Sequence, residues 1–298
     1  MKAKLHEKIT VILFCGFLAV MSVLYWALPA QDFSETEKRQ LAQFPTFSWE
    51  ALTSGQFGSE IETFMADHMP GRNFFVGVGA YYELLTGRQV TKDIYLAEGD
   101  RLVEAPAAWD QTQIDKNMKY VNKFAEKLEV PVDLMVIPSA GFMLQDSIYG
   151  LHGQYRDPDM IQAIYGQAAE GIRTVDILST FQSEADPARL YYRTDHHWTS
   201  YGAYQAYRTY AHHVGKEPMS RDSFRVPAYD GFRGSTYSRS ALWLTPAEPI
   251  EVWQGSSLAV TIGENTFNSA FFPARLEEAD MYTVFLDGNQ AMVRIRNE

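Results

Sequence analysis

The residues best suited to chemistry lie at positions 193–199, which read Arg-Thr-Asp-His-His-Trp-Thr. In an extended segment, residues two apart point to the same side, so we expect Asp195 and His197 to share a face while His196 points elsewhere. A carboxylate beside an imidazole fixes its tautomer and stabilises the imidazolium, as the general base for a serine nucleophile requires. The segment therefore predicts a catalytic pair of Asp195 and His197, with Trp198 as a wall of the pocket.

Two other interpretations of the same residues stay open. Asp195 could simply cap the following helix together with Thr199. Imidazole and carboxylate groups also suit zinc or iron, which makes Asp195, His196 and His197 a candidate metal site. Adjacent histidines in an extended strand do not easily converge on one ion, however, and no Glu-x-x-His or His-x-His partner occurs elsewhere in the sequence. We therefore predict no metal and no cofactor.

The elements predicted around this segment place it at the edge of a sheet. A strand is expected at 189–193, and a helix is expected at 199–214, with Thr199 as its N-cap and Gly215 as its stop. Open α/β sheets hold their active sites at this carboxyl edge of the strands.

Alternating strands and helices upstream predict an α/β fold with a parallel sheet. Buried strands are expected at 132–137 and 174–178, and helices at 111–128 and 158–171. Two helices are expected before these elements, at 56–68 and 73–85, and a hairpin is expected at 94–102 with its turn at Glu98-Gly99-Asp100. Two β segments are expected in the tail, at 250–262 and 283–295.

The N-terminal segment predicts a membrane helix. Residues 9–28 carry no formal charge and are rich in Val, Ile, Leu and Phe. At about 1.5 Å of rise per residue, they span the ~30 Å hydrocarbon layer. Lysines precede the stretch at positions 2, 4 and 8, and acidic residues follow it at 32, 35 and 37, so the positive-inside rule puts the remaining chain outside the cytoplasm. An uncleaved anchor is the favoured interpretation, and cleavage as a signal peptide near 27–30 is the alternative.

Composition limits the classes of function. The chain of 298 residues is 46% hydrophobic and has a formal net charge of −11, so nucleic acid is disfavoured as a partner because an acidic surface repels phosphates. The one cysteine, Cys15, lies in the apolar N-terminal run, which excludes disulfides, a cysteine nucleophile and thiolate metal sites from the remaining chain.

Several motifs together resemble the DHHW family of bacterial proteins, which is similar to the alginate O-acetylation proteins AlgJ and AlgX. The Thr-Asp-His-His-Trp-Thr run is followed by Gly202-Ala203-Tyr204. Residues 35–45 resemble the family's membrane-proximal E-x-E-x-R-x-L-x-x-F-P signature, and 67–72 resemble its D-x-x-P-x-R segment. The Asp-Gly-Phe-Arg-Gly-Ser-Thr-Tyr-Ser run at 230–238 also fits. The resemblance implies an SGNH-hydrolase-like, three-layer α/β/α domain with a parallel sheet.

The resemblance also implies that the Asp-x-His pair works with a serine in a later strand near the C-terminus. No serine here has that context, so the sheet is expected to be C-terminally incomplete and the serine absent. Ser223 follows Asp222, but no buried strand precedes it, and Ser256 and Ser257 are expected in a β-turn. We interpret all three as solvated turn residues.

The resemblance implies O-acetyl transfer, or esterase chemistry, on an extracellular polysaccharide. His197 would be the general base, Asp195 would orient it, and Trp198, Tyr201, Arg72 and Ser139 would line the substrate pocket. The expected organisation is a cytoplasmic N-terminus at 1–8, a membrane helix at 9–28, a juxtamembrane arm at 29–55 and an extracytoplasmic domain at 56–298. A multi-span membrane acyltransferase is the implied protein partner. Because the serine is missing, the chain as given is expected to be inactive, and a non-catalytic module that binds a glycan or a partner is the alternative.

Overall fold

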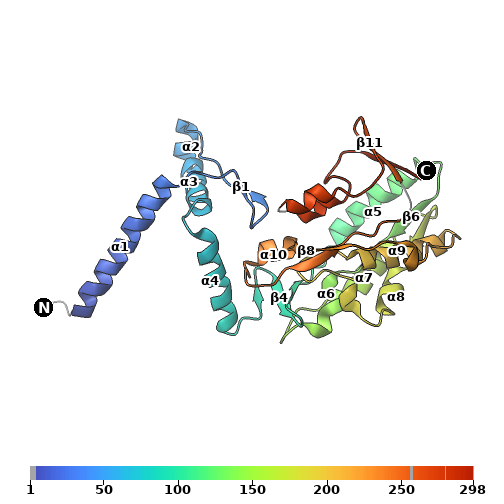
Figure 1. Ribbon diagram of the computed structural model, residues 1–298, viewed down its shortest axis with the longest axis horizontal. Coiled ribbons are helices and arrows are strands. Elements are labelled where there is room, and N and C mark those ends of the chain that lie inside the picture. The colour runs from blue at the N-terminus through green and yellow to red at the C-terminus, as the bar shows by residue number, and fades with distance from the viewer. Residues whose placement is uncertain (1–4, 256–257, 279, 298) are drawn as a thin grey trace. The chain divides into compact units, whose positions relative to one another are not determined.

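The chain forms two compact units, Met1–Tyr81 and Tyr82–Glu298, which are shown in Figure 1 and are described separately. A computed structural model describes residues 5–255, 258–278 and 280–297. The division between the units falls inside a helix, α4, that begins at Arg72 and ends at Leu85.

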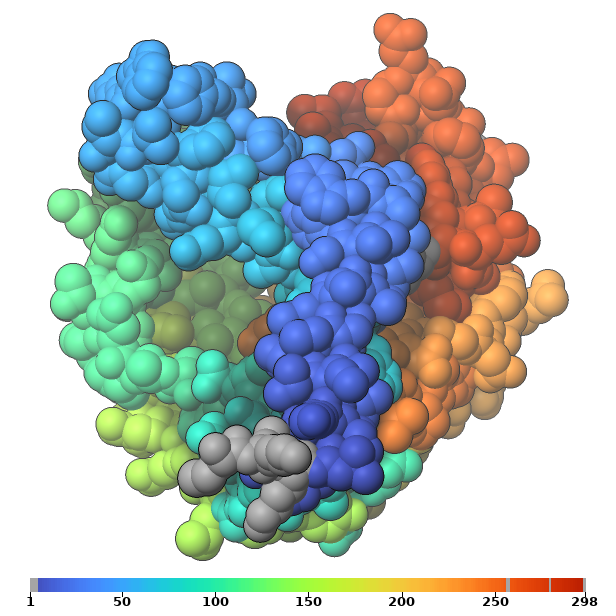
Figure 2. Space-filling view, turned by 90° about the vertical axis from the view of Figure 1, so that its left-hand side faces the viewer, coloured from blue at the N-terminus to red at the C-terminus, as the bar shows by residue number. Residues whose placement is uncertain are grey.

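The first unit begins with a long apolar helix, α1 (Leu5–Ala27). Among the described residues, α1 is the one helix that is both long enough and apolar enough to cross a membrane. None of its side chains is buried. In Figure 2 its side chains form a dark blue ridge that continues into the residues of the arm. The elements that follow it are β1 (Phe33–Ser34), β2 (Arg39–Gln40), α2 (Trp49–Ser54), α3 (Gln56–Asp67) and α4. The helices predicted at 56–68 and 73–85 are thus present as α3 and α4.

Ion pairs fasten the arm to the helices of the first unit. The Arg39 guanidinium donates to both carboxylate oxygens of Asp67, at 3.0 and 2.6 Å, and the backbone N–H of Ala42 donates to the same carboxylate at 2.8 Å. Arg39 and Arg72 also pair with Glu37, at 2.7 and 2.5 Å. These residues belong to the two motifs at 35–45 and 67–72, so the motifs form one contact, which we call the arm latch.

The second unit is a mixed α/β domain. Its helices are α5 (Gln111–Ala125), α6 (Ala140–Leu144), α7 (Asp157–Tyr165), α8 (Ile177–Gln182), α9 (Ser200–His213) and α10 (Ser235–Ser240). Its strands are β3 (Val90–Thr91), β4 (Ile94–Ala97), β5 (Arg101–Glu104), β6 (Val132–Met135), β7 (Ile172–Val175), β8 (Ala228–Phe232), β9 (Glu248–Glu251), β10 (Leu258–Ile262), β11 (Asn265–Phe267) and β12 (Val293–Asn297).

The strands form several small sheets. β6 and β7 pair in parallel, as the alternation of strands and helices predicted, and β4 and β5 form the predicted hairpin. β8 pairs with β9, and β10 pairs with both β11 and β12, all antiparallel. Within the described residues the parallel sheet has two strands, which is shorter than the parallel sheet that the sequence predicted.

Four predicted β segments differ from the structure. In the tail, the segment expected at 250–262 is divided between β9 and β10, and the segment expected at 283–295 begins in a 3₁₀ helix (Met281–Val284) and reaches a strand only at β12. The segment expected as a strand at 189–193 begins at the end of a 3₁₀ helix, and Tyr191 makes only an isolated bridge to Trp198. The strand expected at 174–178 is shifted toward the N-terminus, because Asp176 accepts a hydrogen bond from the Ser179 N–H and so starts helix α8. The capping residue Asp176 therefore ends β7 at Val175, although apolar residues follow at Ile177 and Leu178.

Two buried clusters form the core of the second unit. One gathers Ile177 and Phe181 of α8 with Leu190, Tyr191 and other residues, and the other gathers Tyr192, Phe232, Ile250 and their neighbours. The adjacent residues Tyr191 and Tyr192 therefore point into different clusters. This anchors the chain on both sides just before the Asp-His-His segment.

Candidate active site

The Asp-His-His segment lies in a tight loop that its own backbone closes. The Tyr192 N–H donates to the His197 carbonyl at 3.2 Å, and the Thr199 N–H donates to the Leu190 carbonyl at 2.8 Å. Thr199 also caps α9, since its Oγ1 accepts from the Gly202 N–H at 3.1 Å. The predicted helix and its N-cap are confirmed, and they fix the loop where it meets α9.

Glu248 of β9 holds the first residues of the loop. Its carboxylate accepts the backbone N–H groups of Arg193 and Thr194 at 2.8 and 2.7 Å, and the Thr194 hydroxyl at 2.6 Å. The Thr194 side chain is fully buried, and its Oγ1 accepts the Gly234 N–H at 3.2 Å. Segments far apart in the sequence therefore meet at the residue before Asp195.

Asp195 is fully buried and its carboxylate is surrounded by donors. One oxygen accepts from the His197 ring Nδ1 at 2.6 Å and from the His197 backbone N–H at 2.8 Å. The other accepts from the Ser235 backbone N–H at 2.5 Å and its hydroxyl at 3.0 Å. Burial raises the pKa of Asp195, but the hydrogen bonds from His197 and Ser235 outweigh it and lower the pKa to about 2. Asp195 is therefore a permanent anion at neutral pH.

His197 is the partly accessible member of the pair, with its side chain 53% exposed. Because Nδ1 faces the carboxylate, the neutral ring carries its proton there and presents an unprotonated Nε2. This assignment of the tautomer follows from the hydrogen bond. The arrangement is the one in which a carboxylate orients an imidazole as a general base.

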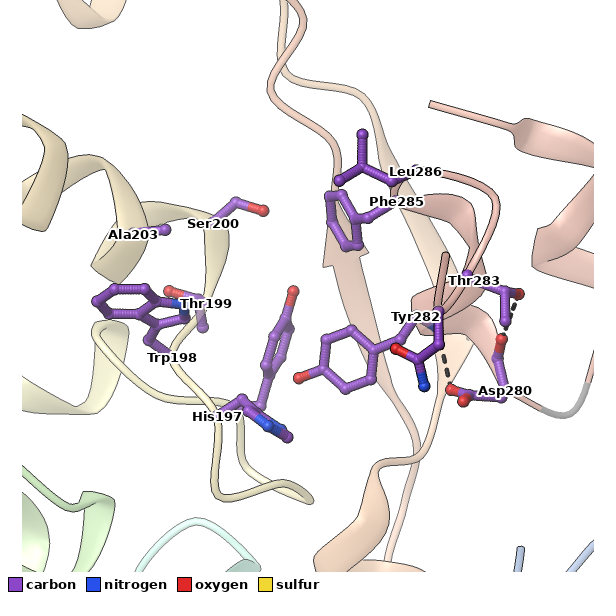
Figure 3. A pocket seen from close by; sticks show the side chains of 13 residues that line it. His197, Trp198, Thr199, Ser200, Ala203, Asp280, Tyr282, Thr283, Phe285 and Leu286 are labelled. Atoms are coloured by element: carbon purple, nitrogen blue, oxygen red, sulfur yellow. Dashed lines mark hydrogen bonds between the residues drawn. The ribbon is translucent and has the colours of Figure 1, made fainter. Parts of the chain in front are cut away.

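His197 lines two cavities. The first, of about 630 Å³, is the Tyr282 cavity; the loop and the start of α9 form one side, and residues 280–289 form the other. Figure 3 shows Trp198, Ser200 and Ala203 on the first side and Tyr282 and Phe285 across from them. The ring of Tyr282 meets the ring of His197 edge-on, with centroids 5.4 Å apart. Among the described residues, no group hydrogen-bonds the buried Tyr282 hydroxyl.

The second cavity, of about 500 Å³, is the Ser139 cavity. His196, His197 and Trp198 line it together with Ser139, which follows β6 and caps α6 by accepting from the Phe142 N–H at 3.1 Å. The structure thus brings the predicted residues Trp198 and Ser139 into a cavity that His197 also borders.

The extended-strand argument predicted that His196 points away from Asp195, and this prediction is wrong. The loop is bent, the rings of His196 and His197 lie 3.9 Å apart, and His196 Nδ1 is 3.7 Å from Asp195. Its Nδ1 also lies 3.4 Å from Glu104 and 3.0 Å from the Ser235 hydroxyl. The nearby Glu104 carboxylate raises the pKa of His196 despite partial burial, and His196 in turn lowers the pKa of Glu104.

The bent loop also changes the metal argument. Ligand atoms of Asp195, His196 and His197 lie within 4.8 Å of one another, so the two histidines do converge. Both oxygens of Asp195 already accept hydrogen bonds, however, and one of these comes from the His197 Nδ1. The donor set observed here serves an imidazole base better than an ion.

The other predicted residues lie elsewhere. Tyr201 donates to Glu184 at 2.7 Å and stacks under the Arg189 guanidinium, outside the lining of both cavities. Arg72 belongs to the arm latch in the first unit, and its role in the pocket stays a prediction. Ser223 ends an exposed 3₁₀ turn, and Ser256 and Ser257 lie outside the described residues.

Sequence reasoning missed four residues of the site: Glu104, Ser235, Glu248 and Tyr282. Ser235 lies in the Gly-Ser-Thr-Tyr-Ser run, and the resemblance of that run to the family assigns no role to Ser235. Glu104 ends β5, two residues beyond the predicted hairpin, and nothing in its local pattern indicates a contact with a histidine 92 positions later. Glu248 and Tyr282 likewise lie in segments where only the tertiary structure reveals their partners.

The fold of the chain is SGNH-hydrolase-like. Residues 94–227 match the family described as the SGNH hydrolase-like domain of the acetyltransferase AlgX, which confirms the predicted resemblance over that part of the chain. No curated protein sequence matches the chain significantly.

Solved structures share the fold at low sequence identity. A DHHW family protein from Eubacterium siraeum is 20% identical with a TM-score of 0.55, and the match covers 70% of this chain and 72% of that one. Bacillus cereus PatB1 is 14% identical with a TM-score of 0.54, covering 68% of this chain and 75% of that one. The structure of PatB1 with a sulfonyl adduct is 13% identical with a TM-score of 0.54, and the match covers 68% of this chain and 73% of that one. The predicted SGNH-like α/β fold is thus confirmed.

Proposed function

We propose that this protein is an extracytoplasmic, membrane-anchored protein of the cell envelope that takes part in the O-acetylation of a polysaccharide. The observation that carries the proposal is the 2.6 Å contact between the buried Asp195 carboxylate and the partly exposed His197 ring, at the border of two cavities. The match of residues 94–227 to the AlgX-type domain supports the acyl-ester class of chemistry.

The pair supplies proton transfer. His197 Nε2 accepts the proton of an attacking hydroxyl as that oxygen bonds to the acetyl carbonyl carbon. The buried Asp195 anion stabilises the imidazolium that results, and the same nitrogen then returns the proton to the leaving oxygen. Because the Asp195 pKa is about 2, this carboxylate stays ionised throughout the cycle at neutral pH.

The attacking hydroxyl is the open part of the mechanism. In the described part of the chain, no serine hydroxyl hydrogen-bonds the His197 ring. Ser139 and Ser200 each share a cavity with His197, but Ser139 Oγ caps α6, and Ser200 Oγ donates to the Glu251 carbonyl at 2.6 Å. We therefore propose that the described residues supply no nucleophilic hydroxyl to His197 and give no turnover by themselves, and that the hydroxyl in an active form comes from outside them.

A non-catalytic module that binds glycan is the second candidate. The engaged hydroxyls of Ser139 and Ser200 favour it, and the intact Asp195–His197 geometry favours the enzyme. In both cases α1 anchors the protein, with its lysine-rich end in the cytoplasm, and a multi-span membrane acyltransferase that delivers acetyl groups is the proposed partner.

Hydrolysis of 4-nitrophenyl acetate by the full chain in detergent tests the proposal, alongside fluorophosphonate labelling. We expect the full chain to hydrolyse the ester no faster than its His197→Ala variant does, and we expect no serine to be labelled. Turnover that His197→Ala abolishes, together with labelling lost in either Ser139→Ala or Ser200→Ala, would show that the chain carries its own nucleophile. Binding of an acetylated polysaccharide without turnover, unchanged in His197→Ala, would favour the binding module.

A further inference from the structure

One face of α4 leaves large apolar side chains uncovered. Phe74 is 68% exposed and Val78 is 51% exposed, and Phe75 lies beside them at 38%. Positions 74, 75 and 78 fall on one side of a helix, while Gly77 and Ala80 on the other side are buried. Contiguous apolar surface of this kind marks a contact with another apolar phase.

The uncovered face adjoins the apolar helix α1. The ring of Phe75 meets the ring of Phe17 edge-on, with centroids 6.3 Å apart. Phe17 lies about 15 Å of helix rise before Ala27, the end of α1. A segment that touches α1 at this point reaches the depth of the lipid acyl chains when α1 spans the bilayer.

The charges of α4 agree with that depth. Between Arg72 and Glu83 the helix carries no formal charge, and its sequence there is Asn-Phe-Phe-Val-Gly-Val-Gly-Ala-Tyr-Tyr. Arg72, at the start of the helix, is paired with Glu37 of the arm latch. The cost of placing a lone cation beside lipid is therefore avoided.

The arm latch keeps α4 near the membrane. Asn73 donates to the Thr36 hydroxyl at 3.1 Å, and His68 contacts the Gln31 carbonyl at 3.0 Å, so the ends of α3 and α4 are fastened to the chain that leaves α1. A helix fastened this close to the membrane surface has little freedom to leave it.

From these observations we infer that the first two turns of α4 lie in the outer leaflet, with Phe74, Phe75 and Val78 against lipid acyl chains. This inference rests on the proposed membrane anchor, and it adds a second membrane contact that sets the depth of the first unit. Apolar and aromatic side chains on one helical face, flanked by charges, bind membrane interfaces in this way.

Site-directed fluorescence in the full chain tests the inference. Cys15→Ser removes the single cysteine, and NBD is then attached to one new cysteine at a time, through Phe74→Cys, Val78→Cys, Leu18→Cys or Glu62→Cys. Glu62 is exposed on α3 and serves as the aqueous control, and Leu18 lies in α1. The proteins are reconstituted in nanodiscs of phosphatidylethanolamine and phosphatidylglycerol, with or without lipids that carry a nitroxide on the acyl chain.

We expect nitroxide lipids to quench the labels at positions 74 and 78 at least about twofold more than the label at position 62, with blue-shifted emission. Strong quenching at position 18 but none at 74 and 78 would overturn the inference and keep the anchor. Blue-shifted labels at 74 and 78 that lipids do not quench would also overturn it, in favour of a protein contact. Absence of quenching at position 18 would overturn the anchor, and the inference with it.

Discussion

Gly234 lies so close to Asp195 that a Cβ at position 234 would be 2.2 Å from the Asp195 carboxylate. The Gly234 N–H donates to Thr194, and the next N–H, of Ser235, donates to Asp195 at 2.5 Å. Only a residue without a side chain allows the start of α10 to approach the carboxylate this closely. The pKa of Asp195 therefore depends on this glycine, because the approach delivers a donor to the buried anion.

Gly234→Ala is expected to destabilise the protein by about 1–3 kcal/mol, since the overlapping atoms belong to a buried side chain that cannot move away. The measurement is urea denaturation followed by tryptophan fluorescence. Gly171→Ala is the matched control, because a Cβ at Gly171 meets nothing within 4 Å, and we expect a change within about 0.5 kcal/mol there. Equal effects of the two substitutions would contradict the tight contact at Asp195.

Glu248 is expected to be a positioning residue for the loop. Glu248→Ala leaves the N–H groups of Arg193 and Thr194 and the Thr194 hydroxyl without their acceptor, which should cost about 2–4 kcal/mol. Glu248→Gln keeps one acceptor oxygen and should cost less. Hydrogen exchange of the Arg193 and Thr194 amides separates a local from a global effect. Unchanged protection of these amides in Glu248→Ala would show that the contact does not hold the loop.

The sequence predicted the elements around the site better than it predicted the loop itself. Helix α9 follows from its N-cap Thr199, and β6 follows from the short run at 132–137, in which Val and Ile are prominent, because both signals are local. The strand expected at 189–193 failed because Pro187 and Asp186 begin a 3₁₀ turn that carries the chain to Leu190. Tyr191 and Tyr192 lie in the segment expected as a strand, but they fill two different cores.

The candidate site was predictable in part for the same reason. Asp195 and His197 are two residues apart, so their contact follows from local geometry together with the motif. The position of His196 depends on Glu104 and Ser235, which are distant in the sequence, so no local pattern indicated it. Tyr282 and Glu248 reach the loop only through the packing of the antiparallel C-terminal strands and turns.

The pair of His196 and Glu104 predicts a pH dependence of stability. Glu104 raises the pKa of His196 above its ordinary value of about 6.5. A raised pKa contributes stability that is fully present below about pH 6.5 and is lost as the pH rises through the raised value. The difference in melting temperature between wild type and His196→Gln should therefore shrink from pH 6 toward alkaline pH. Asp195 acts in the same direction as Glu104, and Arg239 opposes them. A difference that is constant with pH would contradict the ion pair.

Asp195→Asn should destabilise the protein at neutral pH and remove part of its acid sensitivity. An amide placed in this carboxylate site puts an N–H₂ donor against donors from Ser235 or His197, so at least one buried donor is left without an acceptor. In the wild type, folding lowers the Asp195 pKa from about 3.9 to about 2, which corresponds to roughly 2 kcal/mol of stability. That contribution is present above about pH 4 and disappears as the pH falls through 2.

The free energy of unfolding, measured by urea denaturation, should therefore differ less between wild type and Asp195→Asn at about pH 2 than at about pH 5. The control variant Asp222→Asn, at an exposed turn, should have the same stability as the wild type over this range. A gap of constant size over this range would mean that Asp195 is held by packing alone, and that its anion does not orient His197.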